Sequence, residues 1–231
     1  MTEPHERSML VLLIYLIGVL VFHPLFGGQE FESRGLNLMT SLGLVLIALT
    51  LRREKWVLRV GVGLGLPCLA LNLLALWQAP GPVLDLLGHA LLAAFYGFTA
   101  AVFLKHILFS HSIRVERATL YESACVYLLL GLFWGTLFSF IEHLSPGSFH
   151  LDLALTDRHL DWSDFLYHSF VTLTTLGYGD LVPVAPMARS LTLLEAVVGV
   201  FYVTALVARL VSIYRPADAE RERRRCEHDH G

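Results

Sequence analysis

The sequence predicts an all-α membrane protein with six transmembrane helices and a further segment, between the fifth and the sixth, that does not cross the bilayer. Three observations lead to this fold class. Hydrophobic residues make up 55% of the chain and charged residues 16%, whereas soluble domains carry about 25% charged residues. Long apolar stretches follow one another along the chain. Basic residues gather in alternate connections between these stretches.

The spans are placed by length, since crossing a bilayer takes about 20 apolar residues. Turn-forming runs rich in glycine and proline separate them. The first stretch exceeds the ~7–15 apolar residues of a signal peptide, and no small-residue cleavage motif follows it, so we expect a retained helix. The expected spans cover residues 8–26, 35–51, 56–77, 83–109, 121–144 and 187–214.

Basic residues indicate the orientation, because loops rich in lysine and arginine lie on the cytoplasmic side. Both termini are then cytoplasmic, and residues 145–161 form a turret on the outside. The short connections favour a multi-pass protein of the cell membrane, namely a bacterial inner membrane. The basic residues concerned are Arg52, Arg53, Lys55 and Arg59 after the second span, Lys105, Arg114 and Arg117 after the fourth, and Arg215, Arg221, Arg223, Arg224 and Arg225 in the tail.

Residues 172–180, between the fifth and sixth spans, read Thr-Leu-Thr-Thr-Leu-Gly-Tyr-Gly-Asp. A Thr-X-Gly-Tyr-Gly run allows consecutive backbone carbonyls and a threonine hydroxyl to point at one axis. Glycine is needed because alternating residues take left-handed backbone angles. The run resembles the selectivity filter of the potassium channel family. The resemblance extends over residues 121–215, while the earlier part of the chain resembles six-span members only in the number of spans.

The resemblance implies a re-entrant pore helix followed by a selectivity-filter loop, with four chains around a tetrameric pore. Ser163 or Asp164 is expected to cap this helix, which runs to about Thr174 and directs the negative end of its dipole at the ion. The carbonyls of residues 175–178 and the hydroxyl of Thr175 would hold K⁺. The potassium-coordinating filter is assigned to Thr175, Leu176, Gly177, Tyr178 and Gly179.

Three positions near the filter depart from the family's usual pattern. Leu176 stands where valine is usual, and its side chain, like that of Tyr178, is expected to face the pore helix. Val171 stands where some members carry a buried glutamate, and His168 stands where tryptophan is common. Asp180 is therefore expected to have either His168 as a partner or only backbone and tyrosine neighbours. The residues assigned to filter support are Thr174, Asp180, His168 and Val171.

The last span resembles an inner pore helix. Gly199 is either a hinge, since glycine lets a helix bend, or a site of close helix packing. Three valines at helical spacing share one face, which is either an apolar gate that closes by dewetting or a surface against lipid or another subunit. Glu195 is expected to be structural and to hold the inner helix to the pore helix. The valines are Val203, Val207 and Val211.

The first four spans differ from a voltage sensor, since the fourth lacks a basic residue at every third position. We therefore expect weak or no voltage dependence. Three histidines come from different spans without helical pairing and are expected to be structural or interfacial: His23, His89 and His143. The expected domains are a four-helix region over residues 1–110, a pore module over 111–215 and a short charged cytoplasmic tail over 216–231.

The function expected from the resemblance is passive, selective permeation of K⁺ through a homotetramer in the lipid bilayer. The chain shows no catalytic constellation, so we expect no enzymatic activity, no cofactor apart from the permeant K⁺, and no nucleic-acid partner. Two alternatives stay open. One is a weakly selective cation channel on the same scaffold, and the other is a non-conducting membrane sensor or assembly protein that uses the four leading helices.

Overall fold

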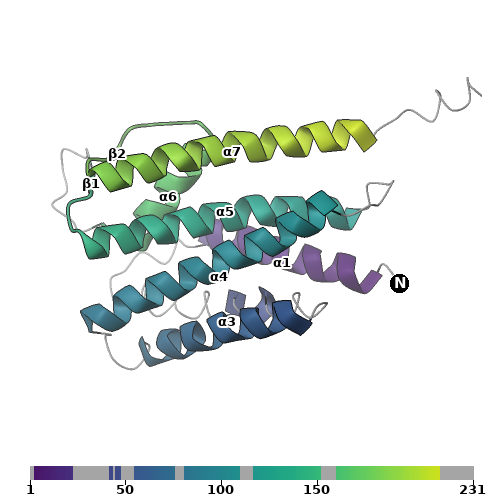
Figure 1. The fold of residues 1–231 in the computed structure, drawn as a ribbon, viewed down its shortest axis with the longest axis horizontal. Coiled ribbons are helices and arrows are strands. Elements are labelled where there is room, and N and C mark those ends of the chain that lie inside the picture. Colours follow the sequence, from purple (N-terminus) through teal and green to yellow (C-terminus); the bar gives the residue numbers. More distant parts are fainter. Residues whose placement is uncertain are drawn as a thin grey trace, which may run out of the picture.

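The computed structural model describes residues 3–22, 42–43, 45–47, 55–75, 81–109, 117–151 and 160–213. Its elements are α1 (Glu3–Phe22), α3 (Lys55–Ala75), α4 (Pro82–Phe109), α5 (Arg117–Leu144), β1 (Phe149–Leu151), α6 (Trp162–Leu173), β2 (Leu181–Pro183) and α7 (Pro186–Ile213). The long helices α3, α4, α5 and α7 run side by side, and the short α6 lies against α5 and α7 (Figure 1).

Within the described residues, four helices are long and apolar enough to cross a bilayer: Lys55–Ala75, Pro82–Leu108, Ala118–Leu144 and Pro186–Ala208. They correspond to the predicted third to sixth spans, and the protein is a mostly helical membrane protein as expected. The first predicted span is helical as far as Phe22, and the second is described only at residues 42–43 and 45–47, which are helical. The remainder of both, like the tail over 216–231, lies outside the described residues. The total of six spans stays a prediction.

Helix α5 is the centre of the single chain. Of its span, 61% is buried, against 17% for α3 and 17% for α7. Its buried residues Cys125, Val126 and Leu129 belong to one apolar core with residues of α1 and α4, such as Leu12 and Phe95. A helix that is apolar all round but little covered by its own chain must find its remaining neighbours in lipid or in other subunits.

Two glycines let α6 approach α5 closely. Gly131 and Gly135 stand one helical turn apart on α5, and a Cβ placed on Gly135 would lie 2.9 Å from the Cα atom of Leu166 in α6. A Cβ on Gly131 would collide with the ring of Phe170. Glycines spaced in this way are a known means of bringing membrane helices together. The sequence carried this signal, and the prediction missed it.

The structure also contains a small two-stranded sheet, whereas the sequence analysis predicted only helices. Strands β1 and β2 pair antiparallel, with His150 opposite Val182. The carboxylate of Glu142, near the end of α5, accepts hydrogen bonds from Gly147 N (2.6 Å) and Phe149 N (3.0 Å), which holds the turn that leads into β1. The sheet thereby ties the segment after α5 to the segment that leads into α7.

Candidate functional site

Helix α6 begins with a capping box. Asp161 has extended backbone angles, and its carboxylate accepts from Ser163 N (2.9 Å) and Asp164 N (3.2 Å). The carboxylate of Asp164 in turn accepts from Asp161 N (3.0 Å). The prediction that Ser163 or Asp164 is the N-cap was wrong, because two carboxylates three positions apart satisfy each other's backbone N–H groups. Asp164 is the third helical residue of this box.

The residues after α6 fold back on its last turn. Thr174 is the C-cap, and its N–H donates to the carbonyl of Phe170 (3.0 Å). The carbonyl of Val171 then accepts from Leu176 N (2.9 Å) and from Gly177 N (3.4 Å). Residues 175–179, called here the filter loop, therefore start directly at the C-terminal end of α6, where a helix dipole favours a cation.

The backbone of the filter loop alternates in handedness. Thr175, Gly177 and Gly179 have φ values of 60°, 59° and 78°, and Thr175 is the one non-glycine residue with positive φ in the part of the chain that the structure describes. For a β-branched residue this is a strained conformation that costs about 1–3 kcal/mol. Consecutive backbone carbonyls that point at one axis are what a row of carbonyl ligands requires, and the left-handed angles at alternate residues fit the alternation expected from the sequence.

The side chains of the filter loop are largely uncovered in one chain. Leu176 is 57% exposed and Tyr178 is 67% exposed. Their expected packing against the pore helix thus accounts for only part of their surface. The rest is open to lipid, solvent or other copies of the chain.

The carboxylate of Asp180 is held by a backbone group and a tyrosine. It accepts from Leu181 N at 3.0 Å, and it is hydrogen-bonded to the hydroxyl of Tyr167 on α6. The ring of His168 instead hydrogen-bonds the backbone of Leu181. Of the two alternatives for Asp180, the structure shows the second. The prediction named no particular tyrosine, because nothing in the local sequence distinguishes Tyr167 from others on an apolar helix.

His168 is buried beneath the small sheet. Its ring lies edge-on to Phe138 of α5, with centroids 5.4 Å apart, and edge-on to Phe149 of β1, at 5.6 Å. Burial lowers the pKa of His168, and the Leu181 backbone and Asp180 oppose this shift. The Nε2 atom has no hydrogen-bond partner among the described residues. The ring thus packs between α5 and the sheet and joins both of them to α6.

On α7, Gly199 is the point of contact with the end of α6. A Cβ at this position would lie 2.9 Å from Cδ2 of Leu173 and 3.3 Å from its Cα and O atoms. This contact favours close packing, while a hinge role stays a prediction. Val203 and Val207 are 43% and 52% exposed, so they lie on a face that one chain leaves uncovered. Val211 belongs to the helix, but its side chain lies outside the described residues.

Glu195 joins the inner helix to α6, as expected. The residue is fully buried, and its Oε1 atom lies 2.5 Å from the hydroxyl of Ser169 in α6. The same hydroxyl is 3.0 Å from the carbonyl of Gly131 in α5. One hydroxyl thus connects α5, α6 and α7.

Residues 125–215 match the model of a family described as Ion channel. The match begins in α5, includes α6 and the filter loop, and ends just after α7. No curated protein matches the sequence. The family match supports an ion channel function in a multi-pass membrane protein, and it points away from an enzyme.

Proposed function

We propose that the protein is one subunit of a homotetrameric potassium channel that lets K⁺ pass down its electrochemical gradient with weak or no voltage dependence. The observation that carries the proposal is the filter loop, with its positive φ angles at residues 175, 177 and 179, between two membrane-spanning helices. Non-helical backbone at membrane depth is tolerated only where protein buries it or where it lines a water-filled cavity. One chain supplies one loop, so several copies must surround the ion.

The proposed mechanism needs no covalent chemistry. Carbonyl oxygens of residues 175–178 and the hydroxyl of Thr175 replace the water around K⁺. The C-terminal end of α6 adds a negative partial charge beneath them. The bonds from Asp180 to Leu181 N and to Tyr167 hold the outer end of the loop. The contact of Leu173 with Gly199 joins its inner end to α7.

Weak voltage dependence follows from where the charges of α4 lie. Asp85 and His89 are near its first turn, and Lys105 and His106 are near its last. Lys105 lies over the ring of Trp56, with Nζ 5.7 Å from the centroid. A unit charge that crosses the membrane gains only about 2.3 kcal/mol per 100 mV, so charges that stay at the two ends contribute little.

A weakly selective cation channel is the second candidate. The observation that favours it is Leu176, which stands where valine is usual and has most of its side chain uncovered in one chain. A bulkier side chain there would alter the spacing between the four loops. In that case Na⁺ would pass at a rate comparable to that of K⁺.

The proposal is tested by ion flux into liposomes that contain the purified full chain. We expect K⁺ to leave K⁺-loaded liposomes down its gradient. The resulting inside-negative potential should drive H⁺ uptake through an added protonophore, and little H⁺ uptake is expected when Na⁺ replaces K⁺ in the liposomes. Gly177→Asp should abolish the flux, because an aspartate at a positive φ is strained and places a carboxylate in the loop. Equal flux of the two ions would favour the second candidate, and equal flux in the variant would refute the proposed pathway.

A further inference from the structure

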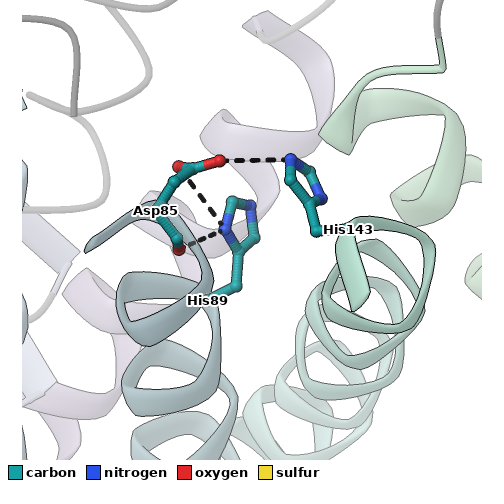
Figure 2. A group of neighbouring side chains, drawn as sticks. All are labelled: Asp85, His89 and His143. Carbon is teal, nitrogen blue, oxygen red and sulfur yellow. Dashed lines mark hydrogen bonds and ion pairs between the residues drawn. The ribbon is translucent and has the colours of Figure 1, made fainter. Parts of the chain in front are cut away.

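Three potential metal ligands meet where α4 begins and α5 ends (Figure 2). Asp85 and His89 stand one turn apart on α4, and His143 is in the last turn of α5. One ligand atom of each lies within 4.8 Å of the others. The sequence led us to expect structural or interfacial histidines, since they come from different spans. The packing of α4 against α5 brings them together, while His23 lies outside the described residues.

The hydrogen bonds of the two histidines fix which ring nitrogen is available. His89 Nδ1 lies 2.9 Å from the carbonyl oxygen of Asp85, and His143 Nδ1 lies 2.7 Å from that of Ser139. A carbonyl can only accept, so Nδ1 carries the hydrogen in both rings. In the neutral rings the lone pair is then on Nε2. Metal-binding histidines are oriented in the same way, by a hydrogen bond from the second ring nitrogen.

The contact between His143 and Asp85 calls for a positive charge. His143 Nε2 lies 3.2 Å from Oδ2 of Asp85. Because the Nδ1 hydrogen is already used, a neutral ring would place its lone pair against a carboxylate oxygen. Either a second proton or a metal ion must lie between them. The His89 ring is stacked on that of His143, with centroids 4.7 Å apart, so its own nitrogen is close to the same point.

The spacing is close to that of a metal centre. Bonds of about 2.0–2.2 Å in a tetrahedral zinc site place the ligand atoms roughly 3.3–3.6 Å apart. The 3.2 Å contact is close to this length, and the ligand atom of His89, which lies within 4.8 Å of the other two, would have to move closer on binding. The side chains of His143 and Asp85 are 39% and 36% exposed, so the single chain leaves them partly uncovered.

We propose that Asp85, His89 and His143 bind a divalent transition-metal ion, with Zn²⁺ as the best fit and water as a fourth ligand. Two imidazoles and one carboxylate suit zinc and its neighbours, whereas Ca²⁺ and Mg²⁺ prefer oxygen ligands alone. The ion would fasten α4 to α5, and hence the leading helices to the pore module. With the predicted orientation of the spans, the site faces the outside.

The test uses Co²⁺ as a coloured substitute for Zn²⁺, added to the purified full chain in detergent. We expect visible absorption bands of four-coordinate Co²⁺ that saturate with increasing metal and disappear when Zn²⁺ is added. The double variant His89→Gln, His143→Gln should lose these bands. The affinity of the double variant for Co²⁺ should fall by at least on the order of 100-fold, because replacing residues that only orient the metal ligands already costs about 10–100-fold.

His106→Gln is the matched control. His106 joins the same two helices at their opposite end, through Glu122 at 2.9 Å, and its replacement should leave the bands unchanged. If the double variant fails to fold, the half-exposed His143→Gln alone replaces it. Bands that persist in the folded ligand variant would mean that the metal is held elsewhere, for example by His228 and His230 in the tail. That result, or the absence of bands in the parent chain, would overturn the proposal. Neither outcome depends on ion conduction.

Discussion

The hydroxyl of Ser169 lies 2.5 Å from the carboxyl group of Glu195 and 3.0 Å from the carbonyl of Gly131. This places a polar junction of three helices inside an otherwise apolar region, close to the filter loop. A buried polar group is costly when it loses its partner. The junction therefore fixes the position of α6 relative to the helices on both sides of it.

Removing the Glu195 side chain should loosen this junction. We expect Glu195→Ala to lower the free energy of unfolding by about 0.5–1.5 kcal/mol, because the hydrogen bond to Ser169 is lost while that hydroxyl keeps the Gly131 carbonyl as a partner. Glu195→Gln keeps an oxygen that can accept the same bond and should cost less. Thermal unfolding followed by tryptophan fluorescence measures the difference. Ser190→Ala, at an exposed position of α7, is the control. Equal midpoints for the alanine variant and the parent would rule out a structural role for the bond.

Gly199→Ala separates packing from bending at the inner helix. The added Cβ would meet backbone atoms of Leu173 at 3.3 Å, which cannot move aside easily. Crowding of this kind costs about 1–3 kcal/mol, so the unfolding midpoint should fall. Gly63→Ala in α3 is the control, since a Cβ there has open space around it. A Gly199→Ala protein of unchanged stability but reduced ion flux would indicate a hinge alone.

Tyr167→Phe removes the hydroxyl that bonds Asp180. In the proposed channel this contact supports the outer end of the filter loop. We expect a higher sodium permeability relative to potassium, or a faster decline of the current, in planar bilayers. Tyr121→Phe, far from the filter loop on α5, should behave like the parent. Identical selectivity and current decay in both variants would show that the bond does not steady the loop.

His168 should make the stability of the protein sensitive to acid. Burial lowers its pKa below the usual 6.5, against the opposing effects of the Leu181 backbone and Asp180. The unfolded chain then binds this proton more readily than the folded one. The contribution of His168 is therefore complete above pH 6.5 and is lost as the pH falls from there toward the folded pKa. His168→Phe should flatten this part of the stability profile. Parallel profiles for the two proteins between pH 7 and pH 5 would contradict the assignment.

The elements of the pore module could be predicted from the sequence because their signals are local. Each signal is contained in one continuous stretch of the sequence. These stretches are the apolar run of α5, the glycine spacing of the filter loop and the apolar run of α7. The contact of Glu195 with α6 could also be anticipated, since a carboxyl inside an apolar helix must face protein or water. These features needed no knowledge of distant partners.

What the sequence did not predict depends on contacts between distant segments. Three such contacts are the pairing of β1 with β2, the bond from Tyr167 to Asp180 and the meeting of His89 with His143. Packing brings these segments together in space, and their spacing along the chain does not reveal it. The capping box was missed for a different reason. Asp161, Ser163 and Asp164 are all good caps, and the reciprocal bonds of the two carboxylates decide among them.

The central claim is tested most directly by the reversal potential of the purified full chain in a planar bilayer, with K⁺ on one side and Na⁺ on the other. A selective filter loop predicts a reversal potential near the potassium equilibrium value, and no current when Gly177 is replaced by aspartate. A reversal potential near zero, or a current that survives Gly177→Asp, would contradict potassium selection by residues 175–179.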